Sequence, residues 1–447
     1  MINTETCIAA ISTPPGVGAI SCVRLSGTDC IAIANKIFKG KKPLKELAGY
    51  TATPGKIVDG KEVIDQVVAL VYKAPNSFTG EDMVEIFCHG APIIAEKILR
   101  LLCESGAKIA APGEFTKRAF LSGKLDLTGA AGVADIISAE NDLAAKNAAA
   151  LLEGAAYKEI SEITESLTSM LAQLDASIDY SDDEEMSEMS LSQEDLDKIS
   201  TRLKTLLESY DIGKLITAGV PAAIVGKPNV GKSTVMNLLL GESRSIVTDI
   251  AGTTRDVISD TLRLKNCTLT LSDTAGIHNT DDLVESIGIE RAKKSIEDAE
   301  LVLLVLDSSR PLEDIDHELL EQTSKKNTLI IINKIDAQSP LFKEFHGRSM
   351  VKISANDKSY GAKLAEKIEQ TLNLNKASDY SFMLSSERQR SLVAAAFDSL
   401  QNIDFAQTAD IIAADIDTAL SALLELTGAR VSEAVIDEIF SKFCVGK

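Results

Sequence analysis

The chain has 447 residues, of which 45% are hydrophobic, and its formal charge at pH 7 is −20. This length exceeds the usual limit of one hydrophobic core and indicates about three domains. The negative charge argues against broad, nonspecific binding of nucleic acid, which needs many Lys and Arg contacts with phosphates, so an RNA partner would need a local basic patch. The longest apolar runs are far shorter than the ~20 residues that cross a bilayer. Since the N-terminal sequence also lacks a signal-peptide pattern, we expect a cytoplasmic protein with no membrane partner.

Residues 1–120 are predicted to form a small α+β domain. The runs CIAAIST, GAISCVRLSG and VIDQVVALVY have the composition of strands and are separated by turns. One helical stretch is expected in this part of the chain, from Pro92 to Glu104.

Residues 121–215 and 377–447 are predicted to be helical, because apolar residues recur three and four positions apart. These residues are Ile160, Ile163, Leu167, Leu171, Leu174 and Ile178 in one helix, Leu196, Ile199, Leu203 and Leu206 in the next, and Ile412, Ile416, Leu420 and Leu423 near the C-terminus. The acidic run from Ser181 to Glu188 is interpreted as a solvated turn. Residues 216–376 have another pattern, so we predict a domain inserted into a discontinuous helical domain whose two parts pack as one bundle.

The inserted segment begins as strand, glycine loop and helix. Later apolar runs, Leu301–Leu306 and Thr328–Ile332, indicate buried strands of a mostly parallel sheet, the pattern of an α/β domain. The loop GKPNVGKS, from Gly226 to Ser233, lies between PAAIV and TVMNLLL, which is the context of a phosphate-binding P-loop. There the backbone N–H groups and the Lys232 amine can bind phosphates, and the Ser233 hydroxyl can ligate Mg²⁺.

Three more loops follow strands in the order that a guanine-nucleotide site requires. Asp273-Thr274-Ala275-Gly276 follows CTLTLS, where the carboxylate can hold Mg²⁺ through water and the glycine N–H can approach the γ-phosphate. Asn333-Lys334-Ile335-Asp336 follows LIII, and the Asp336 carboxylate can accept from guanine N1–H and the 2-amino group, a pair of donors that adenine lacks. Ser354-Ala355, after VKI, supplies a final guanine contact. Four motifs in this order resemble the Ras-like GTPase superfamily.

The catalytic group is not defined by these motifs. Small GTPases have a glutamine directly after DTAG that orients the attacking water, and here this position is Ile277. The next acidic residues are Asp281, Asp282 and Glu285, and residue chemistry alone does not choose among them. Asn229 inside GKPNVGKS and the loop from Thr248 to Thr254 motivate the hypothesis that a fixed potassium ion stimulates hydrolysis when two G domains pair. The ion could occupy the place of an arginine finger, because no such finger is evident.

Sequence segments both inside and outside the inserted domain resemble known families. The loop IVTDIAGTTRD, with GKPNVGKS, resembles the translation-associated GTPases that bind potassium. Five separated segments, STPPGVGAISCVRLSG, SFTGEDMVEIFCHG, APGEFTKRAFLSGKLDLTGA, VESIGIERA and the terminal FCVGK, resemble the tRNA modification GTPase MnmE (TrmE) family. This resemblance covers nearly the whole chain.

The resemblance implies a homodimer with an N-terminal domain for folate binding and dimerisation, a discontinuous helical domain and an inserted G domain. It also implies a heterotetramer with the flavoprotein MnmG, which acts on tRNA. The complex would attach an aminomethyl or carboxymethylaminomethyl group to carbon 5 of the wobble uridine. The one-carbon donor would be 5-formyltetrahydrofolate or a related tetrahydrofolate, and GTP hydrolysis would drive or time the reaction.

The resemblance also implies roles for individual residues. The folate contacts are Arg24, Glu81, Lys124 and Lys447, and the catalytic acid is Glu285. Mg²⁺ is assigned to Ser233 and Thr254, and K⁺ to Asn229, Thr248, Ile250 and Thr253. The complete predicted GTP site comprises Gly226, Asn229, Val230, Gly231, Lys232, Ser233, Thr234, Thr248, Asp249, Ile250, Ala251, Gly252, Thr253, Thr254, Asp273, Thr274, Ala275, Gly276, Asn333, Lys334, Asp336, Ser354 and Ala355.

Alternatives of other classes are also defined. A ribosome-assembly GTPase switch would share the G-domain loops but is expected to carry a basic or aromatic RNA-binding face, which this acidic sequence does not show. A freestanding folate transferase is disfavoured by the long helical segments. Cys444 is interpreted as a small packed thiol, with a role in positioning the one-carbon unit as the second interpretation.

Overall fold

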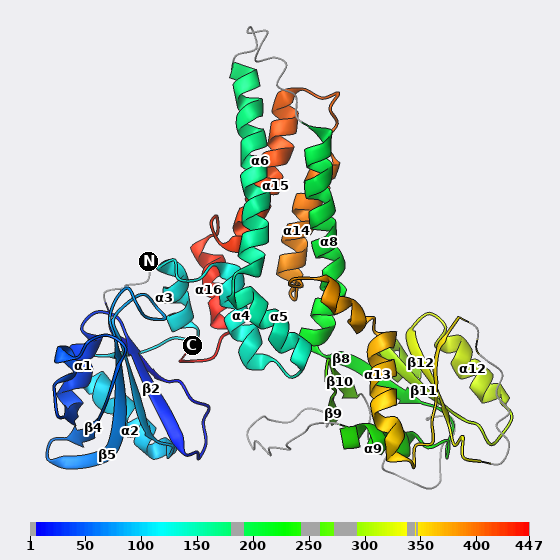
Figure 1. The fold of residues 1–447 in the computed structure, drawn as a ribbon, viewed down its shortest axis with the longest axis horizontal. Helices are drawn as coiled ribbons and strands as arrows, with labels where there is room; N and C mark the ends of the chain where they lie inside the picture. Colours follow the sequence, from blue (N-terminus) through cyan, green and yellow to red (C-terminus); the bar gives the residue numbers. More distant parts are fainter. Residues whose placement is uncertain are drawn as a thin grey trace. The chain divides into compact units, whose positions relative to one another are not determined.

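The computed structural model describes residues 6–179, 192–242, 260–271, 293–337, 345 and 347–446. The chain divides into two compact units (Figure 1). The first unit comprises Met1–Ala134, Ala156–Glu165 and Leu420–Lys447, and the second comprises Asp135–Ala155 and Ser166–Ala419. None of the helices in the described ranges combines the length and the apolar composition needed to cross a membrane.

The first unit is built on a mixed sheet with the strand order β3-β4-β5-β6-β2-β1-β7. The strands are β1 (Ile8–Ile11), β2 (Ile20–Ser26), β3 (Phe38–Gly40), β4 (Thr51–Asp59), β5 (Glu62–Tyr72), β6 (Met83–His89) and β7 (Lys108–Ile109). All neighbours pair antiparallel except β1 and β7, which are parallel. The helices α1 (Cys30–Ile37) and α2 (Pro92–Glu104) pack on the sheet and share its apolar core.

The sequence prediction for this unit needs one correction. The expected helix from Pro92 to Glu104 is confirmed, but it is not the only one, since α1 and α3 (Glu114–Leu121) also lie in this region. The buried residues of α1, Cys30, Ile31, Ile33, Ala34 and Ile37, do have helical spacing. The signal is short, and a run of eight residues rich in Ile and Ala is ambiguous between strand and helix.

The C-terminal segment of the chain also belongs to the first unit. The helix α16 (Glu433–Ser441) packs on α3 and on the start of α4 (Leu127–Ser138), and these helices share a small apolar cluster around Phe440. An ion pair between Lys117 and Asp437 joins α3 to α16. After α16 the chain continues to Val445, which forms an isolated antiparallel β-bridge with Pro112.

The second unit contains a sheet with the strand order β13-β12-β11-β8-β10-β9. Its strands are β8 (Val220–Val225), β9 (Asp260–Arg263), β10 (Thr268–Leu271), β11 (Leu301–Asp307), β12 (Asn327–Asn333) and β13 (Ser349–Lys352), all parallel except β9. Alternate residues of β11 face two separate apolar cores. One core includes α9 (Lys232–Glu242) and α13 (Gly361–Thr371), and the other includes α12 (Asp314–Gln322), so helices cover both faces of the sheet.

Helices flank this α/β domain in the sequence. They are α5 (Asp142–Leu152), α6 (Ala155–Asp179) and α8 (Gln193–Ala218) before it, and α14 (Glu387–Gln401) and α15 (Ala409–Thr427) after it. The expected helical faces of α8 and α15 are buried, and α8 packs along α14 (Figure 1). The Tyr210 hydroxyl donates to Glu387 across this contact at 2.8 Å. The predicted fold class, with an α+β region, helical segments and an inserted domain with a mostly parallel sheet, is confirmed.

Candidate functional site

The P-loop from Gly226 to Ser233 connects β8 to α9, and its glycines are required by close packing. Gly226 has φ 149°, and a Cβ there would lie 2.4 Å from the Val305 carbonyl oxygen. Gly231 has φ 98°, and a Cβ there would lie 2.3 Å from Asn333 Nδ2. Both positions exclude other residues, because each combines a left-handed backbone with contact against a neighbouring strand end.

The Lys232 amine lies across this loop. It donates to the carbonyl oxygens of Gly226 and Lys227, at 2.8 Å each. Burial lowers the pKa of Lys232, because the charged amine is partly removed from water. An anionic partner would stabilise this cation. Ser233 is exposed at the start of α9, where helix N–H groups point outward. The arrangement suits a phosphate chain above the loop.

Asn333 joins three of the predicted loops. Its Nδ2 donates to the Val230 carbonyl of the P-loop at 2.9 Å, and its Oδ1 accepts from the Ala355 N–H at 2.9 Å. Asn333, Val230 and Ala355 are all buried. The structure therefore brings GKPNVGKS, NKID and Ser354-Ala355 together at the carboxyl ends of parallel strands, which is where α/β sheets bind ligands.

A second link between these loops runs through Lys334. Its Nζ donates to the Asn229 carbonyl oxygen at 2.7 Å. Lys334 has φ 61° and Asn229 has φ 63°, a conformation that non-glycine residues uncommonly adopt. Asp336 follows in a turn closed by the Ala337 N–H on the Lys334 carbonyl at 3.0 Å, and its side chain is exposed. The two links hold the P-loop and the NKID loop in one fixed arrangement.

One contact of the P-loop was missed by sequence reasoning. Lys227 Nζ lies 2.6 Å from Asp316 Oδ2 and 3.2 Å from a Glu313 carboxylate oxygen. Burial would lower the pKa of Lys227, but hydrogen bonds to these carboxylates outweigh it and raise the pKa. Glu313 and Asp316 form the capping box of α12. The spacing of these two acidic residues is the sequence pattern that could have indicated them.

Several predicted site residues lie outside the described residues. They are Thr248, Asp249, Ile250, Ala251, Gly252, Thr253 and Thr254 of the loop, Asp273, Thr274, Ala275 and Gly276 of DTAG, the predicted catalytic Glu285 and the terminal Lys447. The acidic run from Ser181 to Glu188 also lies outside them.

A second group of predicted residues gathers in the first unit. Arg24 on β2 pairs with Glu85 on β6, with Nη2 2.7 Å from Oε1, and the Tyr72 hydroxyl donates to the other oxygen of Glu85 at 2.9 Å. The guanidinium also lies over the rings of Phe78 and Phe115, at 5.8 and 5.7 Å from their centroids. Burial and the Glu85 carboxylate raise the pKa of Tyr72, so a neutral phenol holds Glu85, and Arg24 in turn is held by this carboxylate and two aromatic faces.

Glu81 is held by a buried arginine that sequence reasoning did not single out. Arg118 Nη1 lies 3.2 Å from Glu81 Oε2, and the Ser26 hydroxyl donates to the same oxygen at 2.7 Å. Arg118 is only 2% exposed and its Nη2 also contacts Glu114 at 2.8 Å. The sequence around Arg118 does not indicate that it is buried, because a charged residue on a short helix usually points to solvent.

Lys124 follows α3 in a loop that contacts the Glu81 segment. The Ser122 hydroxyl donates to the Thr79 carbonyl at 2.6 Å, and the space beside Gly80 is bounded by Ser122 and by Lys124 Cε. The Lys124 side chain is exposed. The structure thus brings Glu81 and Lys124 onto adjoining loops of one unit.

The C-terminal residues extend this cluster. The Gly446 carbonyl oxygen accepts from Ser12 Oγ at 3.1 Å and from Arg24 Nη1 at 3.3 Å. Gly446 has φ 91°, and a Cβ there would lie 2.7 Å from the Ile11 carbonyl oxygen. Cys444 was expected to be packed, which is wrong, because its side chain is exposed although its carbonyl accepts from the Gly113 N–H at 3.3 Å.

Comparison with known proteins identifies the family. A family model described as "GTP-binding protein TrmE N-terminus" matches residues 7–124, and one described as "MnmE helical domain" matches residues 127–444. The tRNA modification GTPase MnmE of Streptococcus thermophilus is 42% identical over 448 residues, and the alignment covers 98% of each chain. The chain belongs to the tRNA modification GTPase MnmE family. The MnmE protein of Lactococcus lactis subsp. lactis is also 42% identical, over 449 residues and 98% of each chain.

Membership of the MnmE family confirms the predicted enzyme class, a GTPase. Among solved structures, the G domain of FeoB from Methanococcus jannaschii is 23% identical over 34% of this chain and 96% of its own. The TM-score of this pair is 0.26.

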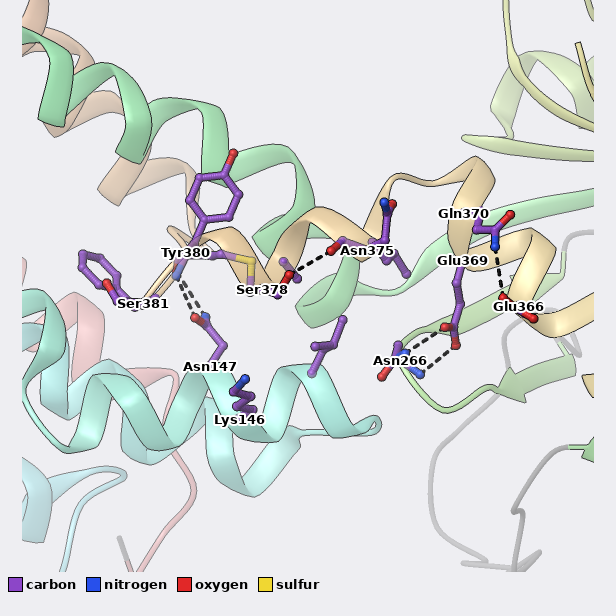
Figure 2. Close-up of a pocket in the computed structure, with 15 residues that line it drawn as sticks. Lys146, Asn147, Asn266, Glu366, Glu369, Gln370, Asn375, Ser378, Tyr380 and Ser381 are labelled. Atoms are coloured by element: carbon purple, nitrogen blue, oxygen red, sulfur yellow. Dashed lines mark hydrogen bonds between the residues drawn. The ribbon is translucent and has the colours of Figure 1, made fainter.

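The second unit of this MnmE-family chain also contains a cavity of about 330 Å³ between α5, α13 and the segment from Leu374 to Met383 (Figure 2). Glu369 points toward Asn266 and accepts a hydrogen bond from its Nδ2 at 2.8 Å, and Asn147 pairs with both the N–H and the carbonyl of Met383. None of the P-loop or NKID residues lines it. We interpret it as part of the junction between the inserted domain and α5, not as a nucleotide site.

Proposed function

We propose that this chain binds and hydrolyses GTP as a subunit of a complex that modifies carbon 5 of the wobble uridine in certain tRNAs. The product is an aminomethyl or carboxymethylaminomethyl group, and the carbon donor is 5-formyltetrahydrofolate or a related tetrahydrofolate. The observation that carries the proposal is the set of contacts of Asn333, which ties the P-loop to the Ser354-Ala355 loop in a member of the MnmE family.

Selection of guanine rests on Asp336. Its carboxylate matches the N1–H and 2-amino donors of guanine, and the exposed side chain in a tight turn next to Lys334 is accessible to a base. Replacing Asp336 by Asn should shift preference from GTP to xanthosine triphosphate, which has a carbonyl at position 2. Fluorescence titration with both nucleotides measures this shift, and unchanged GTP affinity in the variant would refute the role of Asp336.

Metal ions complete the proposed G site. Mg²⁺ is assigned to Ser233 and Thr254, and K⁺ to Asn229, Thr248, Ile250 and Thr253. The hydroxyl and amide oxygens of this set suit hard cations, and the side chains of Ser233 and Asn229 are exposed at the P-loop. When bound, the ions neutralise charge on the phosphates during transfer. The protein's own part is to hold the P-loop N–H groups and Lys232 in place, while Glu285 orients the attacking water.

The folate site is proposed in the first unit, at Arg24, Glu81, Lys124 and Lys447. Glu81 retains acceptor capacity beyond its bonds from Ser26 and Arg118, which suits pterin N–H groups. The exposed ammonium of Lys124 suits the glutamate carboxylates of the ligand. Arg24 donates to the Gly446 carbonyl and so also holds the segment that carries the terminal residue.

The folate assignment has a direct test. Deleting Lys447, or adding a bulky tag after it, should weaken 5-formyltetrahydrofolate binding in calorimetry and leave GTP binding unchanged. A tag inserted in the acidic run from Ser181 to Glu188 is the matched control. Equal folate affinity in the C-terminal variants and the control would rule out a role for the C-terminus.

We assign the protein to the cytoplasm as a homodimer that forms a heterotetramer with the flavoprotein MnmG and acts on tRNA. Digestion of bulk tRNA from a deletion strain, followed by mass spectrometry, should show loss of the modified wobble uridine. Complementation with the parent chain is the control. Intact wobble uridine together with defective ribosomal particles would instead support the alternative, a ribosome-assembly GTPase switch.

A further inference from the structure

Asp307 lies beside the NKID loop but belongs to none of the nucleotide-binding motifs. It is the last residue of β11, which pairs with β12, and it stands opposite Asn333 in the parallel register. The carboxylate is buried, with its side chain 6% exposed. A buried carboxylate is costly unless it is paired, so its partners indicate why the position is acidic.

The partners of Asp307 are on two sides. Oδ2 lies 2.7 Å from Lys334 Nζ and 3.9 Å from Arg310 Nε, and Oδ1 accepts from the Ser309 N–H at 2.9 Å and from the Ser309 hydroxyl at 2.6 Å. Burial would raise the pKa of Asp307, but the hydrogen bonds from Lys334 and Ser309 outweigh it and hold the pKa below its ordinary value. The carboxylate is therefore ionised at neutral pH and is itself fixed by the turn that follows β11.

The residue between these partners adds to the same contact. Ser308 Oγ donates to the Lys334 carbonyl at 2.8 Å, and the Ser308 N–H donates to the Asn333 carbonyl at 2.9 Å. The segment Asp307–Ser309 thus holds both ends of Lys334, its ammonium through Asp307 and its backbone through Ser308.

Lys334 needs this support because its ammonium also holds the P-loop. Its Nζ also donates to the Asn229 carbonyl oxygen at 2.7 Å, and both residues are in the left-handed backbone region. Such conformations persist only where the surroundings over-determine them. An ammonium shared between one carbonyl and one buried carboxylate is held more firmly than an ammonium on a carbonyl alone, because the charged acceptor makes the stronger bond.

We propose that Asp307 is a positioning residue for guanine-nucleotide binding, which fixes Lys334 against the P-loop carbonyl of Asn229. This inference rests on the proposed guanine site at the NKID loop. Asp307 does not touch the nucleotide and acts only through Lys334. A purely structural ion pair would stabilise the domain without a specific effect on nucleotide binding. The two roles therefore differ in whether removal of Asp307 changes the nucleotide affinity.

The test is a double-mutant cycle in the full-length protein, with N-methylanthraniloyl-GDP and Mg²⁺ as the probe. Asp307→Ala should weaken binding by roughly ten- to a hundred-fold, the usual effect of removing a charged hydrogen-bond partner, mainly through faster dissociation. The KM for GTP should rise more than kcat falls. Asp307→Asn should lose less, because the amide oxygen can still accept from Lys334.

The decisive measurement is the coupling with Lys334→Ala. In that background Asp307→Ala should have little further effect on affinity, since the group through which it acts is gone. Asp298→Ala, an exposed aspartate of the same unit, is the matched control and should bind as the parent does. If Asp307→Ala destabilises the fold in circular dichroism, the isosteric Asp307→Asn supplies the arm of the cycle.

Three results would overturn the inference, and only the third would also refute the guanine site. Parent-like affinity in Asp307→Ala would show that the ion pair does not affect the nucleotide. Full additivity of Asp307→Ala and Lys334→Ala would show that Asp307 acts independently of Lys334. A parent protein that bound the adenine analogue as tightly as the guanine analogue would refute the guanine site itself, and the inference with it.

Discussion

Replacement of Asn333 by Asp tests the central contact of the nucleotide site. The new side chain has the same size, and its remaining oxygen can still accept from the Ala355 N–H. The donor to the Val230 carbonyl becomes an acceptor, so two oxygens face each other where the bond is now 2.9 Å. We expect weaker nucleotide binding, because the P-loop must move away to relieve this repulsion and must return to bind phosphates.

The magnitude follows from burial. Both Asn333 and Val230 are almost fully buried, so the unpaired carbonyl costs about 1–3 kcal/mol. Repulsion between the two oxygens adds to this, which gives about 2–4 kcal/mol in total. At 1.4 kcal/mol for each factor of ten, nucleotide binding should weaken by about 30- to 700-fold. Protonation of the new carboxyl restores a donor, so affinity should recover as the pH is lowered.

The assay is stopped-flow fluorescence with N-methylanthraniloyl-GDP across a pH series. Asn375→Asp, at an exposed position of the same unit, introduces the same charge without removing a buried bond and is the control. The reasoning is refuted if Asn333→Asp binds nucleotide as tightly as Asn375→Asp, or if its affinity fails to improve in acid.

Three further predictions concern catalysis, the cation and acid stability. Glu285→Ala should slow GTP hydrolysis by about 10²–10⁴ in a phosphate-release assay with little change in affinity, and a parent rate would exclude its catalytic role. Hydrolysis should be faster in KCl than in NaCl at equal ionic strength, and Asn229→Ala should abolish the difference; equal rates in both salts for the parent would contradict the potassium site. Hydrogen bonds from Arg390 and Tyr210 lower the pKa of Glu387 to about 2, so their stabilising effect is present above the ordinary Glu pKa and is lost as the pH falls toward 2. Glu387→Gln should therefore reduce the loss of stability of α8 and α14 in acid, measured by hydrogen exchange as a function of pH. An unchanged pH dependence would exclude this contribution.

Much of the fold follows from local periodicity. The apolar spacing from Ile160 onward predicted α6, and the spacing from Leu196 predicted α8, because a helix buries residues three and four positions apart along its whole length. The runs at Leu301 and Thr328 predicted β11 and β12, since strands buried on both faces are continuously apolar. The short helix α1 was missed because its signal spans only eight residues.

The sequence alone was enough to locate the P-loop, NKID and Ser354-Ala355 as motifs, because these loops use characteristic residue types at fixed spacing next to strands. Contacts between distant side chains have no such local signal. That Asn333 bridges Val230 and Ala355, that Asp307 holds Lys334, and that buried Arg118 holds Glu81 depends on which strand ends and loops lie side by side. Only the tertiary structure decides this, because the order of strands in a sheet is set by the packing of the whole core and not by any one segment.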